Sequence, residues 1–217
     1  MKERPILFST EMVKGILDGR KTQTRRVKNL KEINLNPASW RYVAKLGGSW
    51  KDKAKYIFRF INPTGHSVNI ASPYGLPGDR LWVRETFLVE RSQHKDFYEY
   101  KADYSNTFAG DVCWNPSIFM PREACRILLE VMDVRVERLQ EITEEDAKAE
   151  GITDVEFYPD EGFPLSVGHM AGKDDGKTSL HTTRVKAYTA LWGSINGKGS
   201  WEKNPWVWVI EFKRIEP

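Results

Sequence analysis

The chain has very little cysteine and histidine, and it lacks any long apolar run. Cys113 and Cys125 are the only cysteines among 217 residues, and the four histidines stand far apart. This pattern argues against a disulfide scaffold and against a metal site built from clustered Cys and His ligands. No run of about 18 apolar residues occurs, and the N-terminus has no apolar signal core, so neither a membrane-spanning helix nor a secretory signal is expected. We therefore expect a cytoplasmic protein without a bound metal or cofactor.

The chain also lacks a strong excess of charge of either sign. Lys and Arg number 33 and Asp and Glu number 30, which gives a net charge of +3. Composition alone therefore provides no general attraction to nucleic acid, and a basic surface has to arise from local clustering. Hydrophobic residues make up 40% of the chain, enough for one sizeable core. Because no repeat or linker divides the sequence, residues 1–217 are expected to form a single domain.

Strand patterns outnumber helix patterns. Strands are expected near 6–8, 56–61, 79–87, 97–101, 126–139 and 206–212, with a bulge at the 131-to-134 step. Helices are expected from Thr10 to the Gly19 stop, from the Thr143 capping box to the Gly151 stop, and over 183–194. The segments 28–56 and 154–182 lack periodicity and are interpreted as loop insertions, the second of them mobile. We predict an α+β fold, namely a small, partly open β-barrel with two to three flanking helices.

The segment Gly19-Arg20-Lys21-Thr22-Gln23-Thr24-Arg25-Arg26 is the densest cluster of cations and hydroxyls. As a generic charge run it would be a solvated turn, but it contains no acidic partner and follows a helix stop. A partly desolvated Lys21 beside arginines would have a lowered pKa and can act as a base, and a nearby threonine can act as a nucleophile. Lys21 and Thr24 lie three positions apart, so they can line one pocket only if residues 21–23 include a turn or bulge.

Two further segments carry candidate site residues. Glu150 ends the predicted acidic helix, where a carboxylate opposes the helix dipole, so a cation is expected beside it, either Lys21 or one of the arginines. In the strand 79–87, Trp82 and Arg84 share one face, which suits stacking of an unpaired base, while Glu85 lies on the other face with Leu81 and Val83. A core tryptophan with an Arg–Glu ion pair is the equally weighted alternative. Trp114 and Arg122 flank a proline-containing loop and can rim a pocket.

The Gly19–Arg26 cluster resembles the Gly-Arg-Lys-Thr-x-Thr-x-Arg signature of the ASCH domain, a relative of the PUA fold. The Pro77-Gly78-Asp79 turn, the Leu139–Gly151 segment and the terminal Trp206–Lys213 strand also look like that family. With its Leu-Trp-Val-Arg-Glu-Thr strand, the chain looks most like the larger members encoded in phages and prophages. The compact bacterial members are N(4)-acetylcytidine amidohydrolases, and the resemblance implies a catalytic set of Lys21, Thr24 and Glu150.

The resemblance implies an amidohydrolase that removes an acyl group from a modified base such as N(4)-acetylcytidine. Thr24 would attack the acyl carbonyl, Lys21 would take its proton, and Glu150 would orient Lys21. The expected contacts to a nucleoside or RNA come from Arg20, Arg25, Arg26, Trp82, Arg84, Glu85, Trp114 and Arg122. A non-catalytic module that binds RNA or a modified base is the alternative, and a ribonuclease is a third hypothesis that no paired histidines support.

Overall fold

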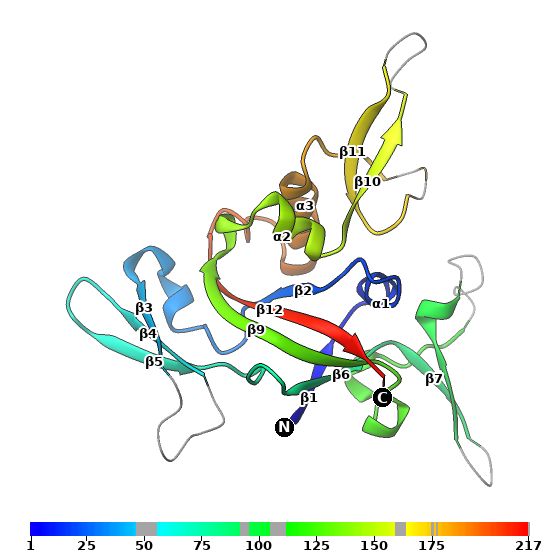
Figure 1. Ribbon diagram of the computed structural model, residues 1–217, viewed down its shortest axis with the longest axis horizontal. Coiled ribbons are helices and arrows are strands. Elements are labelled where there is room, and N and C mark those ends of the chain that lie inside the picture. Colours follow the sequence, from blue (N-terminus) through cyan, green and yellow to red (C-terminus); the bar gives the residue numbers. More distant parts are fainter. Residues whose placement is uncertain are drawn as a thin grey trace.

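Five strands that lie far apart in the sequence form the central sheet. The computed structural model describes residues 1–46, 56–91, 96–104, 112–158, 164–174, 176 and 178–216. The sheet has the order β1-β6-β9-β12-β2, with bounds Glu3–Leu7, Arg80–Arg84, Leu128–Arg138, Trp206–Ile215 and Gln23–Arg26. β1 runs parallel to β6, and every other neighbouring pair is antiparallel. The long curved strands β9 and β12 form the middle of the molecule (Figure 1).

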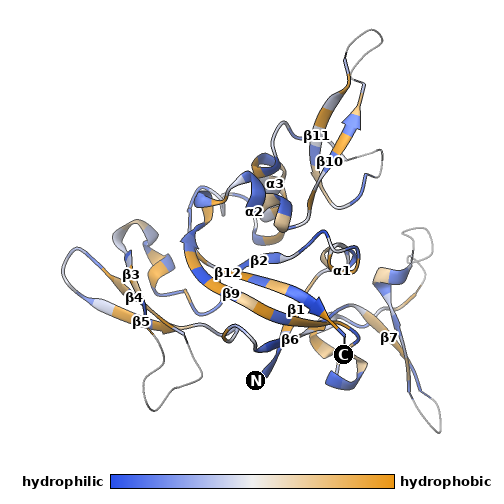
Figure 2. Ribbon diagram, viewed as in Figure 1, coloured by the Kyte–Doolittle hydropathy of each residue, from blue (hydrophilic) through white to orange (hydrophobic). Residues whose placement is uncertain are grey.

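The alternation of side chains along β12 explains why this strand lies at the centre. Trp208, Ile210 and Phe212 point into the main core, whereas Val207 and Val209 belong to a second core under the helices. Both faces are therefore apolar, as expected for a strand that is covered on both sides, and apolar residues recur along β9 and β12 in Figure 2. The register between β9 and β12 shifts at Glu211 and Phe212, which confirms the bulge expected between residues 131 and 134.

Three small sheets extend from this centre (Figure 1). One consists of β3 (Arg41–Leu46), β4 (Ile57–Ile61) and β5 (Ser67–Ala71). The second pairs β7 (Phe87–Glu90) with β8 (Phe97–Tyr100), and the third pairs β10 (Ile152–Phe157) with β11 (Ser166–Ala171).

The two expected loop insertions therefore contain regular structure, and that part of the expectation was wrong. The 28–56 segment includes β3, and the 154–182 segment includes most of the β10–β11 hairpin. Residues 47–55, 159–163, 175 and 177 of these segments lie outside the described residues. Exposed and half-buried residues alternate along β3, so its apolar pattern is weak and its pairing depends on β4.

Three α-helices occur in the described ranges: α1 (Thr10–Leu17), α2 (Glu144–Ala149) and α3 (Arg184–Asn196). Thr143 caps α2 by accepting a hydrogen bond from the Asp146 N–H, and the Asp146 side chain accepts one from the Thr143 N–H, which confirms the capping box. Gly151 follows α2 with φ +100°. Such a left-handed conformation suits glycine and lets the chain leave α2 for β10.

The structure confirms a mixed α+β fold that is mostly sheet. The expected partly open barrel is not confirmed, because the sheets are not closed into a barrel. β1 and β2 lie at opposite ends of the strand order, and the Arg26 Nη2 donates a hydrogen bond of 2.7 Å to the Leu7 carbonyl of β1. A side chain, rather than a backbone ladder, therefore joins these two edges.

None of the described helices is both long enough and apolar enough to span a bilayer.

Candidate functional site

Lys21 and Glu150 form a buried ion pair where the end of α2 meets the start of β2. The Lys21 Nζ lies 2.5 Å from the Glu150 Oε2 and donates a second hydrogen bond of 2.9 Å to the Glu150 carbonyl. The two side chains are 1% and 3% exposed. The cation that the helix-dipole argument required beside Glu150 is thus present, and it is Lys21.

Local hydrogen bonds explain why these distant segments meet. The last carbonyls of a helix have no partner within the helix. The Thr22 N–H donates to the Ala149 carbonyl at 2.9 Å, and the Arg20 Nη1 donates to the Gly151 carbonyl at 3.4 Å. The carbonyl between these two, that of Glu150, accepts the bond from Lys21. β2 begins only at Gln23, so Lys21 lies before the strand and is free from its strict alternation. Arg20, expected to contact a ligand, therefore anchors the helix end and also pairs with Asp18.

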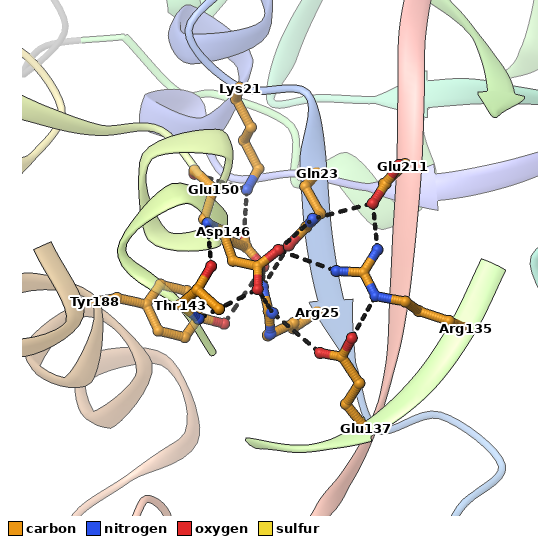
Figure 3. Close-up of polar contacts among 10 residues, drawn as sticks. All are labelled: Lys21, Gln23, Arg25, Arg135, Glu137, Thr143, Asp146, Glu150, Tyr188 and Glu211. Atoms are coloured by element: carbon orange, nitrogen blue, oxygen red, sulfur yellow. Dashed lines mark hydrogen bonds and ion pairs between the residues drawn. The ribbon is translucent and has the colours of Figure 1, made fainter. Parts of the chain in front are cut away.

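Arg25 is the centre of a polar network on the other side of Glu150 (Figure 3). Its guanidinium is fully buried, 3.1 Å from an Asp146 oxygen, 3.3 Å from Glu137 and 3.7 Å from Glu150 Oε1. It also donates to the Gln23 side chain. Since every charge around it is matched at close range, Arg25 can hold Glu150 in one orientation without leaving an unpaired buried ion.

Arg135, on β9, extends this network to Glu211 on β12. It forms ion pairs with Glu137, Asp146 and Glu211, the Asp146 contact being 2.9 Å. Burial opposes ionisation of Asp146, but hydrogen bonds from Gln23 and the Thr143 N–H and the charges of Arg25 and Arg135 lower its pKa to about 2. Asp146 is thus a permanent anion at neutral pH, which suits an anchoring role rather than proton transfer.

Burial lowers the pKa of Lys21, and the neighbouring charges of Arg26 and Arg25 act in the same direction. The Glu150 carboxylate opposes this shift by favouring the ammonium form, but desolvation is the larger effect. The Tyr188 hydroxyl lies 3.4 Å from Glu150 Oε1. Burial, together with the charge of Glu150, raises the pKa of Tyr188 well above its ordinary value, so the hydroxyl stays protonated.

A cavity of about 420 Å³ opens beside this network, between the edge strands β1 and β2 and helix α3. This volume falls within the range of about 300–1,000 Å³ common for small-molecule sites. Glu150, Thr24 and Tyr188 line the cavity, as do Arg25, Arg26 and Arg84. Its apolar wall includes Ile6, Met12 and Leu191. A flat, partly polar ligand could therefore contact apolar surface and several donors at once.

Lys21 itself lines a separate, smaller recess of about 40 Å³, which Glu150 also lines. Glu150 therefore separates the ammonium of Lys21 from the cavity that contains Thr24. The structure brings Lys21 and Glu150 into contact and places Thr24 in the same cavity as Glu150, but Lys21 and Thr24 face different spaces.

Two buried donors beside the cavity have no hydrogen-bond partner among the described residues: the Nε atoms of Arg25 and Arg26. Trp192 also lines the cavity, and its buried indole N–H likewise has no hydrogen-bond partner among the described residues. Buried donors are nearly always paired in folded proteins. Three such donors therefore belong to residues that line this one cavity.

The other expected binding residues lie outside this centre, apart from Arg84. The Arg84 guanidinium lies 5.3 Å from the Trp82 ring centre and donates to the Met120 and Ile118 carbonyls. Arg122 lies 6.0 Å from the same ring. Alternation along β6 therefore places Trp82 and Arg84 on the expected face, next to a second arginine.

Glu85 and Trp114 make contacts with other side chains away from the cavity. Glu85 is 1% exposed and pairs with Arg126 at 2.9 Å. This is an Arg–Glu ion pair, as in the alternative interpretation of the strand, but its arginine comes from another segment. Trp114 packs edge-on against Tyr104, and Arg122 pairs with Glu3 at 2.9 Å. In the described part of the chain, none of Glu85, Trp114 and Arg122 lines the cavity.

Tyr188, Asp146 and Arg135 were missed as site residues by sequence reasoning. Tyr188 lies in the helix expected over 183–194, and its contact with Glu150 spans 38 positions. Asp146 was assigned only to the helix cap. Among the residues that the structure describes, no group of three or more potential ligands is arranged to hold a metal ion.

No protein-family model, curated protein or solved structure matches this chain.

Proposed function

We propose that the chain is an ASCH-type amidohydrolase that removes an acyl group from the exocyclic nitrogen of a modified base such as N(4)-acetylcytidine. The observation that carries this proposal is the buried Lys21–Glu150 pair beside a cavity that also contains Thr24. The same three residues occupy the positions that the sequence resemblance assigns to catalysis. Both edge strands, β1 and β2, line the cavity, which supports the finer interpretation of the sheet as a partly open, PUA-like barrel.

In the proposed reaction, the Thr24 hydroxyl attacks the acyl carbonyl carbon. The new C–O bond forms an ester on Thr24, and the C–N bond to the base breaks. The proton of Thr24 passes to the Lys21–Glu150 pair and from there to the departing nitrogen. A water molecule then cleaves the ester, which releases the carboxylic acid and restores the hydroxyl.

The Lys21–Glu150 pair acts as one proton-accepting unit in this scheme. Glu150 lines both the cavity and the recess of Lys21, so it is the member through which a proton from the cavity reaches the pair. The lowered pKa of Lys21 makes the neutral, proton-accepting amine easier to reach than for an exposed lysine. The tyrosine hydroxyl and Arg25 hold the second carboxylate oxygen in place.

The buried Nε atoms of Arg25 and Arg26 supply candidate donors for the oxyanion that forms on the acyl oxygen. Both residues line the cavity, and donors fixed before the reaction stabilise such a charge without reorganisation. Arg26 is further held by its bond to the Leu7 carbonyl and by the Phe8 ring, 4.9 Å from its guanidinium carbon.

The experiment is to incubate the full chain with N(4)-acetylcytidine and to follow cytidine and acetate release by chromatography. Thr24→Val keeps the buried volume and removes the hydroxyl, so it should abolish release. Thr22→Val is the matched control, because Thr22 is exposed, is not among the residues that line the cavity, and bonds to α2 through its backbone N–H. No release by the wild-type protein would overturn the activity, and full release by Thr24→Val would overturn the nucleophile.

A second candidate function, a non-catalytic module for RNA or a modified base, is favoured by a separate observation. Arg26, Lys28 and Arg84 line the cavity, and none of them has a carboxylate partner among the described residues. Such unpaired cations suit phosphate contacts. Salt-dependent RNA binding that weakens in Arg84→Ala, without any turnover, would favour this function over hydrolysis.

A further inference from the structure

A second cavity of about 350 Å³ adjoins the first one across helix α3. Val27, Trp192 and Asn196 line both cavities, so the two spaces share a wall formed by the end of β2 and by α3. The remainder of the second cavity is formed by residues after β2 and by the segment that leads into β12, including Lys31, Ser200 and Lys203. None of these residues takes part in the proposed reaction.

Two buried polar atoms at the second cavity have no hydrogen-bond partner among the described residues. They are the indole N–H of Trp192 and the hydroxyl of Ser200. Trp192 is only 5% exposed. An indole nitrogen can only donate, and a hydroxyl can donate as well. Both atoms therefore call for a ligand group with acceptor oxygens.

The charges around this cavity point to an anion. Lys31 and Lys203 both line it, and in the described ranges neither ammonium has a carboxylate partner. No Asp or Glu is among the described residues that line the second cavity. Lys28 lines the first cavity and adds a further cation next to Val27, which lines both. Cations and neutral donors without a nearby acid form the surroundings that a phosphate group requires.

We propose that the second cavity binds a phosphate group of a nucleotide whose base occupies the first cavity. The placement of the base rests on the proposed function, whereas the phosphate subsite rests on the second cavity alone. The substrate is then a nucleotide or a nucleic-acid strand in preference to a free nucleoside. Trp192 lines both cavities and so lies between the two subsites, and its indole N–H has no partner among the described residues.

The test compares three ligands on the full chain: cytidine, cytidine 5′-monophosphate and a short fluorescein-labelled oligocytidylate RNA. Calorimetry measures binding of the two small ligands, and fluorescence anisotropy over a salt series measures binding of the RNA. The test variant is Lys31→Ala/Lys203→Ala. The matched control is Lys2→Ala/Lys148→Ala, which removes the same charge from two exposed lysines that line neither cavity.

The test variant should bind the phosphorylated ligand about tenfold more weakly, with cytidine binding unchanged. For the RNA, the slope of log K against log salt should fall by about 0.7, since each neutralised single-strand phosphate contributes about that amount and the subsite holds one. Trp192→Phe, which keeps an aromatic side chain and removes the N–H, should also weaken binding of the phosphorylated ligand. An effect on cytidine monophosphate assigns the site to a single nucleotide, and an effect confined to the RNA assigns it to a strand.

Equal loss in the test and control variants would overturn the phosphate subsite, as would equal loss for cytidine and its monophosphate. N(4)-acetylcytidine hydrolysis is measured on the same preparations. Hydrolysis with no phosphate-dependent loss refutes only the subsite. Phosphate-dependent loss without any hydrolysis refutes only the proposed activity.

Discussion

Replacement of one partner of the Lys21–Glu150 pair should destabilise the fold far more than replacement of both. The variants are Lys21→Met, Glu150→Gln and the double variant. Both side chains are nearly inaccessible to solvent, at 1% and 3% exposure, so a single replacement leaves a buried group without its counter-charge.

The magnitude follows from the geometry. At 2.5 Å the attraction between unit charges is about 7 kcal/mol for an effective dielectric constant of about 20. Desolvation of two ions offsets most of this attraction, so the pair adds little net stability, whereas loss of one partner from a buried pair costs about 3–5 kcal/mol. Arg25 at 3.7 Å and the Tyr188 hydroxyl at 3.4 Å remain beside Glu150 in Lys21→Met. We therefore expect a cost near the lower limit, about 3 kcal/mol, for Lys21→Met.

Urea denaturation followed by circular dichroism measures the free energy of unfolding of all four proteins. The double variant should be more stable than Lys21→Met by about 2 kcal/mol, which corresponds to a strong positive coupling between the two sites. Additive losses, with a coupling below about 0.5 kcal/mol, would refute the buried pair as described.

The same variants test the direction of the Lys21 pKa shift. Because the folded-state pKa is lower than the unfolded value of about 10.4, the unfolded chain binds more protons in between. The contribution of Lys21 to stability therefore rises with pH through that window and is smallest below the folded pKa. The stability difference between wild type and Lys21→Met should grow from about pH 8 to about pH 10, and a shrinking difference would contradict a lowered pKa.

Three further predictions concern the elements that support the site. Thr143→Ala should cost about 1 kcal/mol in urea denaturation, because it removes the hydroxyl that accepts from the Asp146 N–H. The pKa of Asp146 is about 2 in the folded protein and 3.8 in its unperturbed state, so its contribution to stability is present above about pH 4 and is lost as the pH falls toward 2. Asp146→Asn should remove that part of the acid sensitivity, and an unchanged acid profile would contradict the assignment. Gly151→Ala should destabilise the fold by about 1–2 kcal/mol because of its φ of +100°. Gly193→Ala, in α3 with no heavy atom within 4 Å of the added Cβ, should stabilise it by about 0.5–1 kcal/mol, and equal effects of the two alanines would refute the backbone argument.

Local features of the site could be predicted because their signals act over a few residues. The Thr143 capping box and the Gly151 stop define α2 and place Glu150 at its end. A carboxylate in that position requires a cation, and the sequence offered Lys21 or the arginines beside it. The alternation in β6 likewise predicted which face carries Trp82. Each of these signals depends on backbone geometry within one element.

The longer-range features had no such signal. The β10–β11 hairpin was missed, because strands at an exposed edge lack a strong apolar alternation. The contacts of Tyr188 with Glu150 and of Arg135 with Asp146 join different elements, and nothing near these residues in the sequence specifies their partners.

The sequence by itself therefore determined the three α-helices, the buried strands β1, β6, β9 and β12, and the need for a cation at the end of α2. Only the tertiary structure decided that Lys21 and Glu150, 129 positions apart, meet at 2.5 Å, and that Glu150 stands between Lys21 and the cavity of Thr24. The physical reason is that propensity and capping act through neighbouring backbone groups. Which side chains share a cavity depends instead on how the completed sheet and helices pack against one another.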